Sequence, residues 1–120
     1  MRDRPSGAEL LAEARRVLRE ELLPELTGVA RFKALMIGNA LGMAERELAA
    51  GEEPVRAMQA RLSELLDESG TLDALERRLA GEIRGGARDG DAATYRTLRA
   101  DVLARLAESN PRALADVEPL

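Results

Sequence analysis

Apolar residues recur every three or four positions along most of the chain, a pattern typical of amphipathic helices. It predicts five helices, at about residues 6–23, 29–50, 54–67, 71–84 and 91–109. The turns between them are short, so consecutive helices are expected to pack antiparallel. The fold class is therefore predicted to be all-α, a five-helix up-down bundle in a single domain over residues 1–120. Residues 1–5 and 112–120 are expected to fray, or to add one short turn at the C-terminus.

The second predicted helix, from Val29 to Ala50, has an unusual composition. No charged residue lies between Lys33 and Glu45, which predicts a helix that is covered on most sides and stands buried at the centre of the bundle. Small residues recur at every fourth position and form one stripe, on which another helix can approach closely. The first helix or a symmetry mate is expected there. The four residues of this packing stripe are Ala30, Ala34, Gly38 and Gly42.

Several residues mark helix ends. Ser6 followed by Glu9 forms a capping box at the first helix. Pro24 is expected to stop or kink this helix, because proline lacks an amide hydrogen and crowds the preceding turn. Thr71 and Asp91 suit the N-caps of the last two helices. The fifth helix is expected to present an apolar face made of Ala92, Tyr95, Leu98, Val102 and Leu106.

The composition limits the chemistry that the chain can perform. It has no cysteine and no histidine, which excludes disulfides, thiolate chemistry, histidine-based acid-base catalysis and metal binding by the usual soft donors. No cofactor and no metal are predicted, and the chain is not expected to be an enzyme. Its single Phe32 and single Tyr95 occupy apolar helical positions, where packing in the core is expected.

The formal net charge is −4, and the basic residues do not form one run. This balance disfavours nucleic-acid binding, because the chain has no net attraction for a phosphate backbone. The polar N-terminus does not resemble a secretory signal, and the uncharged part of the second helix is too short to span a membrane. We expect a cytoplasmic protein that does not bind membranes.

Asn39 is the most unusual residue of the second helix, because a buried amide is costly unless it is hydrogen-bonded. It either ties two helices together and fixes their register, or lines a pocket and contacts a ligand. Arg46 lies seven residues later on the same face, and Glu47 follows it. Asn39, Arg46 and Glu47 are therefore the candidate residues for binding a ligand or a partner. Glu45 is expected to form an ion pair rather than to act in acid-base catalysis.

Three stretches resemble a bacterial family of small all-helical proteins of unknown function: Arg4 to Pro24, Phe32 to Leu48 and Leu98 to Arg112. Members of that family are often encoded beside aminoglycoside-phosphotransferase-like kinases and acyl-CoA dehydrogenases. In this resemblance, the family's recognisable positions are occupied by Phe32, Asn39, Arg46, Glu47, Asn110 and Pro111. The resemblance implies a genomic setting and no activity.

Two functional hypotheses follow. The first is a non-catalytic accessory or protein-interaction bundle that pairs with a phosphotransferase-like kinase, an acyl-CoA-metabolising enzyme or another copy of itself. The second is a bundle that binds a small acyl or acyl-CoA-type molecule in an inter-helix pocket, with Asn39 and Arg46 in its wall.

Overall fold

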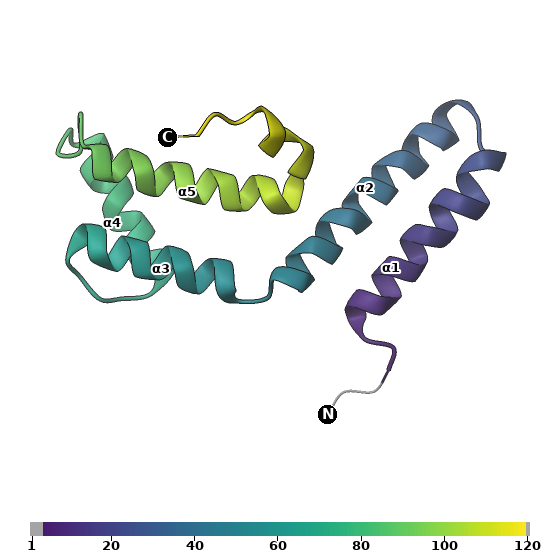
Figure 1. Cartoon of the computed structure of the whole chain (residues 1–120), viewed down its shortest axis with the longest axis horizontal. Coiled ribbons are helices and arrows are strands. Elements are labelled where there is room, and N and C mark those ends of the chain that lie inside the picture. Colours follow the sequence, from purple (N-terminus) through teal and green to yellow (C-terminus); the bar gives the residue numbers. More distant parts are fainter. Residues whose placement is uncertain (1–3, 120) are drawn as a thin grey trace. The chain divides into compact units, whose positions relative to one another are not determined.

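The computed structural model describes residues 4–119 and shows an all-α protein (Figure 1). Within this range no strand is present, and no helix is both long and apolar enough to cross a membrane. The elements are α1 (Gly7–Val17), η1 (Leu18–Leu22), η2 (Leu23–Glu25), α2 (Gly28–Ala50), α3 (Glu53–Leu66), α4 (Leu72–Arg84), α5 (Ala92–Ser109) and η3 (Pro111–Asp116).

The backbone contacts divide the chain into two compact units. The first runs to Gly51 and includes Glu108–Asn110, and the second comprises Glu52–Ala107 and the residues from Pro111 onwards. The five predicted helices are present, but their arrangement as one bundle around a buried second helix is not confirmed. The predicted fraying at residues 1–5 lies largely outside the described residues, and the C-terminal segment forms the short 3-10 helix η3.

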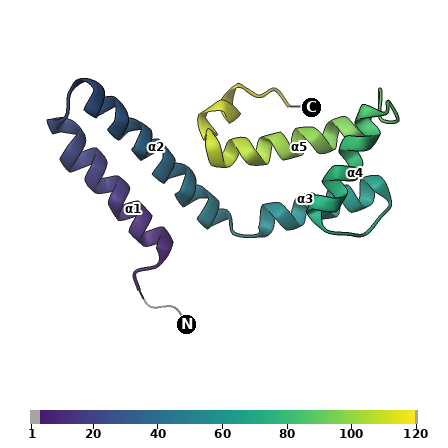
Figure 2. The ribbon, with the colours of Figure 1, turned by 180° about the vertical axis from the view of Figure 1, so that it is seen from behind.

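The first unit is a hairpin in which α1 lies alongside α2 (Figures 1 and 2). The Ser6 hydroxyl accepts a hydrogen bond from the Glu9 amide at 3.2 Å, which is half of the predicted capping box. Near Pro24 the first helix changes to a π-helical turn and then to a 3-10 turn, since proline cannot continue the α-helical hydrogen bonding. The buried cluster of this unit is Leu18, Leu23 and Ala34.

The stripe of small residues on α2 lies mostly against α1. Ala34, Gly38 and Gly42 are buried, whereas Ala30 is exposed. A Cβ atom at Gly38 would lie 3.5 Å from Leu18 Cδ2, which is ordinary van der Waals contact. At Gly42 the nearest atoms belong to the side chains of Arg46 and Arg15, so both glycines make room for side chains rather than for the backbone of the first helix.

The remaining surface of α2 is largely uncovered. Phe32 is 63 % exposed and Met36 is 56 % exposed, so the prediction that Phe32 packs in the core is wrong. The enclosure of α2 on most sides is likewise not confirmed. The physical reason is that α2 carries two stripes, one of small residues and one of large apolar residues, and α1 covers only the first.

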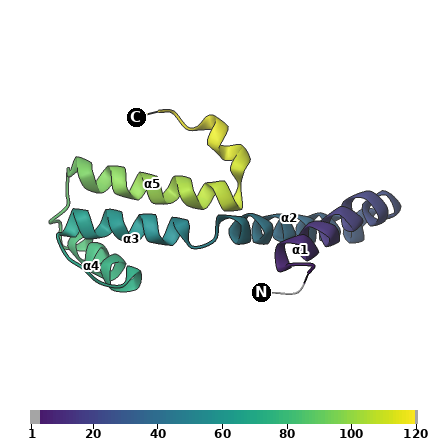
Figure 3. The ribbon, with the colours of Figure 1, turned by 60° about the horizontal axis from the view of Figure 1, so that its bottom comes forward.

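The second unit has its core between α3 and α4. The buried residues are Met58, Leu62, Leu66, Leu75 and Leu79. Thr71 caps α4, because its hydroxyl accepts a hydrogen bond from the Ala74 amide at 3.2 Å. In Figure 3, α5 runs along α3, after a loop in which Gly86 and Gly90 adopt positive φ.

The orientation of α5 is opposite to the prediction. Thr94 and Thr97 are buried, whereas Tyr95 is 60 % exposed and Val102 is 52 % exposed. The buried hydroxyls are satisfied locally, since Thr97 Oγ1 donates to the Ala93 carbonyl at 2.9 Å and Thr94 Oγ1 donates to Asp91. The prediction that Tyr95 packs in the core is therefore wrong.

Candidate interaction faces

The first candidate site is the exposed apolar face of α2. We call it the α2 face and define it by five residues on one side of the helix, Val29, Phe32, Met36, Asn39 and Met43. Its four apolar members are 43–69 % exposed. Contiguous exposed apolar surface of this kind is typical of interaction sites on proteins.

Asn39 lies within the α2 face and is exposed, contrary to the expectation of a buried amide. Its neighbours one turn away on the same helix are Leu35, Met36 and Met43, all of which are exposed as well. Its amide therefore supplies the polar group of an otherwise apolar surface. The role of Asn39 in binding stays a prediction.

The structure separates the other predicted binding residues. Arg46 is half-buried, and its Nε donates to the Glu108 carbonyl at 2.6 Å. Glu47 is exposed, and no ion pair is found for it within residues 4–119. Glu45 lies on the side facing α1, where its Oε2 is 2.6 Å from Arg15 Nε, so it forms the ion pair that was expected.

The second candidate site is the exposed apolar face of α5, formed by Tyr95, Leu98, Val102 and Leu106. Tyr95, Leu98 and Val102 are 39–60 % exposed, and Leu106 is partly covered. The inward side of α5 carries Thr94 and Thr97 together with partly buried Ala93, Ala100 and Leu103, so α5 has apolar residues on both sides. The large apolar side chains of Tyr95, Leu98 and Val102 therefore remain exposed, although burial of such side chains normally stabilises a helix.

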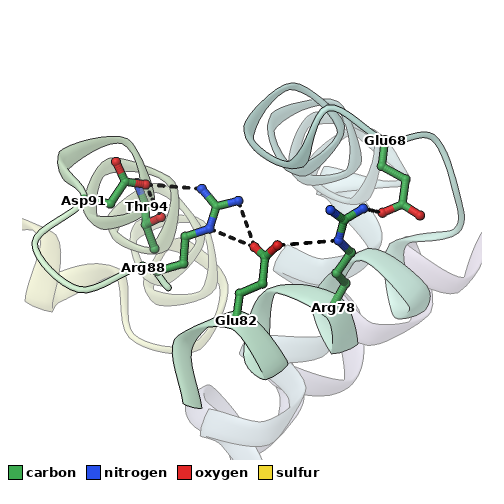
Figure 4. Close-up of polar contacts among 6 residues, drawn as sticks. All are labelled: Glu68, Arg78, Glu82, Arg88, Asp91 and Thr94. Atoms are coloured by element: carbon green, nitrogen blue, oxygen red, sulfur yellow. Dashed lines mark hydrogen bonds and ion pairs between the residues drawn. The ribbon is translucent and has the colours of Figure 1, made fainter. Parts of the chain in front are cut away.

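A network of charged residues holds the loop before α5 (Figure 4). In the loop, Arg88 Nη2 lies 2.8 Å from Glu82 Oε2 of α4, and Arg88 Nη1 lies 3.3 Å from Asp91 Oδ2. Arg78 forms ion pairs with both Glu82 and Glu68. Asp91 accepts hydrogen bonds from the Thr94 amide at 3.3 Å and the Thr94 hydroxyl at 2.6 Å. These contacts tie the glycine-containing loop to α4 and to the start of α5.

Asp91 gives the network a pH dependence. The hydrogen bond from Thr94, together with the Arg88 guanidinium, lowers the pKa of Asp91 below its ordinary value. A carboxyl group with a lowered pKa in the folded state stabilises the fold above its unfolded pKa of about 4, and this contribution is lost as the pH falls through the folded value.

We expect Asp91→Asn to lower the free energy of unfolding at pH 7, with the difference from the native chain shrinking at pH 3. Urea unfolding at the two pH values measures this difference. Asp89→Asn, in the same loop, is the matched control, because no ion pair within the described residues involves Asp89. An Asp91→Asn deficit that is equal at both pH values would contradict the electrostatic role.

A cavity of about 510 Å³ lies between α3 and α5 within the second unit. Its wall combines apolar and small residues with charged residues of both signs: Leu65, Ala93, Thr97 and Ala100, and Arg61, Glu64, Arg88, Asp91 and Arg96. Within residues 4–119, neither Arg61 nor Arg96 forms an ion pair. The wall contains neither Asn39 nor Arg46, so this cavity is not the predicted pocket.

The described residues contain no group of three or more acidic side chains placed to hold a metal ion. The large apolar residues of the α2 face were not predicted to form a surface, because the enclosure predicted for α2 would place them in the core. Their spacing was nevertheless visible, since Val29, Phe32, Met36, Asn39 and Met43 alternate intervals of three and four residues.

Comparison with known proteins adds one match. Residues 24–113 match the model of a family described as a domain of unknown function (DUF6285). No curated protein and no solved structure matches the chain.

Proposed function

Because the chain belongs to the DUF6285 family, whose description names no activity, we propose its function from its own surface: it is a non-catalytic interaction protein. In this proposal the α2 face and the α5 face each bind a helix in the cytoplasm. The partner is another copy of the chain, a phosphotransferase-like kinase or an acyl-CoA-metabolising enzyme.

The observation that carries the proposal is the exposure of Phe32, Met36 and Met43 along one side of α2. Burying a side chain of this size contributes about 1.5–3 kcal/mol, so a helix that covered the face would gain substantially from the contact. Large apolar residues grouped in this way occur on monomeric proteins mainly where something binds.

Co-purification with paired variants tests this function. Phe32→Asp places a charge on the α2 face, and Ile37→Asp places the same charge on an exposed apolar position elsewhere on α2. We expect the native chain and Ile37→Asp to recover the same bound proteins, which can include an untagged copy of the chain. Phe32→Asp should not recover them. Equal recovery with all three chains would contradict a role for the α2 face.

The alternative function is binding of a small acyl or acyl-CoA-type molecule, which the cavity between α3 and α5 favours. Leu65, Ala93 and Ala100 supply apolar contacts for an acyl chain, and Arg61 and Arg96 suit phosphate or carboxylate groups. Acyl-CoAs should then raise the melting temperature of the native chain and of Arg84→Ala, but not of an Arg61→Ala/Arg96→Ala variant. Asn39→Ala should respond like the native chain, because Asn39 does not line this cavity.

A further inference from the structure

We propose that the α2 face pairs with the α2 face of a second copy of this chain, with the two helices antiparallel. The inference rests on the proposed function and deepens it by naming the partner and the orientation. Three features of α2 carry it: the spacing of its apolar residues, the positions of two charges and the position of Asn39.

The spacing is that of a coiled-coil seam. Starting at Val29, the α2 face follows alternating intervals of three and four residues, and the same spacing continues to Arg46 and Ala50. Two helices with such a stripe pack side by side along their length. The residues that contact α1, including Gly38 and Gly42, lie on another side of α2, so the hairpin leaves the seam accessible.

Two charges flank the seam on one edge. Lys33 and Glu47 each directly follow a seam position, and each lies seven residues from Ala40. Both are exposed, and within residues 4–119 neither has an ion-pair partner. A two-fold axis passing beside Ala40 would place Lys33 of each copy opposite Glu47 of the other, so that two ion pairs form per dimer.

The parallel orientation does not offer this complementarity. In a parallel pair, Lys33 would lie opposite Gly28 of the partner helix, and Glu47 would lie opposite Gly42, so neither charge would meet an opposite charge. The charges therefore favour the antiparallel pair.

Asn39 gains a role in this arrangement. It lies one residue from the axis, so the two Asn39 side chains approach each other at the middle of the seam. A single polar residue in an apolar seam is known to fix register and orientation, because any slip leaves its amide without a partner. Asn39 would thus set the register between two copies rather than within one chain.

Charge reversal tests the pair. Lys33→Glu and Glu47→Lys each place like charges opposite one another twice per dimer, which should weaken self-association about tenfold or more. An equimolar mixture of the two variants restores both ion pairs, as does the double variant, so both should associate as tightly as the native chain. Sedimentation equilibrium measures these constants, and circular dichroism checks that every variant retains its helices.

The outcomes separate this inference from the function on which it rests. The antiparallel pair is supported if each single variant self-associates more weakly than the native chain and the equimolar mixture associates as tightly as the native chain. A native chain that stays monomeric at several hundred micromolar overturns the pair, while the co-purification experiment still decides whether the α2 face binds other proteins. A native dimer whose association neither reversal changes overturns the antiparallel register.

Discussion

Leu62→Ala is expected to lower the free energy of unfolding of the second unit by about 2–5 kcal/mol, the range for deletion of a fully buried leucine side chain. Leu62 is 0 % exposed and lies on α3 among Leu66, Leu75 and Leu79. The core of this unit consists of few residues, so removing the Leu62 side chain takes away a large part of its buried apolar surface. A loss of this size is a large share of the stability of a small domain.

Val55→Ala is the matched control for this prediction, since Val55 lies on the same helix and is 51 % exposed. Its replacement should change stability by less than about 0.5 kcal/mol. Urea unfolding followed by circular dichroism compares the two variants. A Leu62→Ala variant as stable as Val55→Ala would show that the core of the second unit lies elsewhere.

The helices themselves could be predicted because their limits are encoded locally. Ser6 and Thr71 accept the hydrogen bonds that their positions indicated, and Gly51, directly after α2, adopts a positive φ. Thr27 occupies the N-cap of α2 but makes no side-chain hydrogen bond there. Capping and termination depend on a few neighbouring residues, so the sequence alone suffices to locate them.

The sides on which the helices are buried could not be predicted in the same way. Periodicity shows that α2 has a stripe of small residues and a stripe containing Phe32 and Met36, but not which of them α1 covers. On α5 it favoured Tyr95 as an inner residue, whereas the structure buries Thr97. The choice depends on packing between distant segments, and on which surfaces remain for a partner.

The candidate site shows the same limit. An amide in an uncharged helix is unusual, which makes Asn39 a candidate, and in the structure it is the polar member of the α2 face. Arg46 was grouped with it by spacing, yet its guanidinium is engaged by the Glu108 carbonyl. Spacing on one helix identifies residues that share a side, but contacts made by more remote residues decide which of them are available.

The central claim, that α2 turns an apolar face outward and closes it against a second antiparallel α2, can be tested with single cysteines. The chain contains no cysteine, so each introduced thiol is unique. Ala40→Cys places the two thiols beside the proposed axis. Val29→Cys places them about 33 Å apart along antiparallel helices, at 1.5 Å per residue, but next to each other along parallel ones.

The measurement is the yield of covalent dimer formed by a short bismaleimide with each variant at equal concentration. The antiparallel pair predicts efficient cross-linking of Ala40→Cys and almost none of Val29→Cys. Preferential cross-linking of Val29→Cys, or no covalent dimer with either variant, would contradict it.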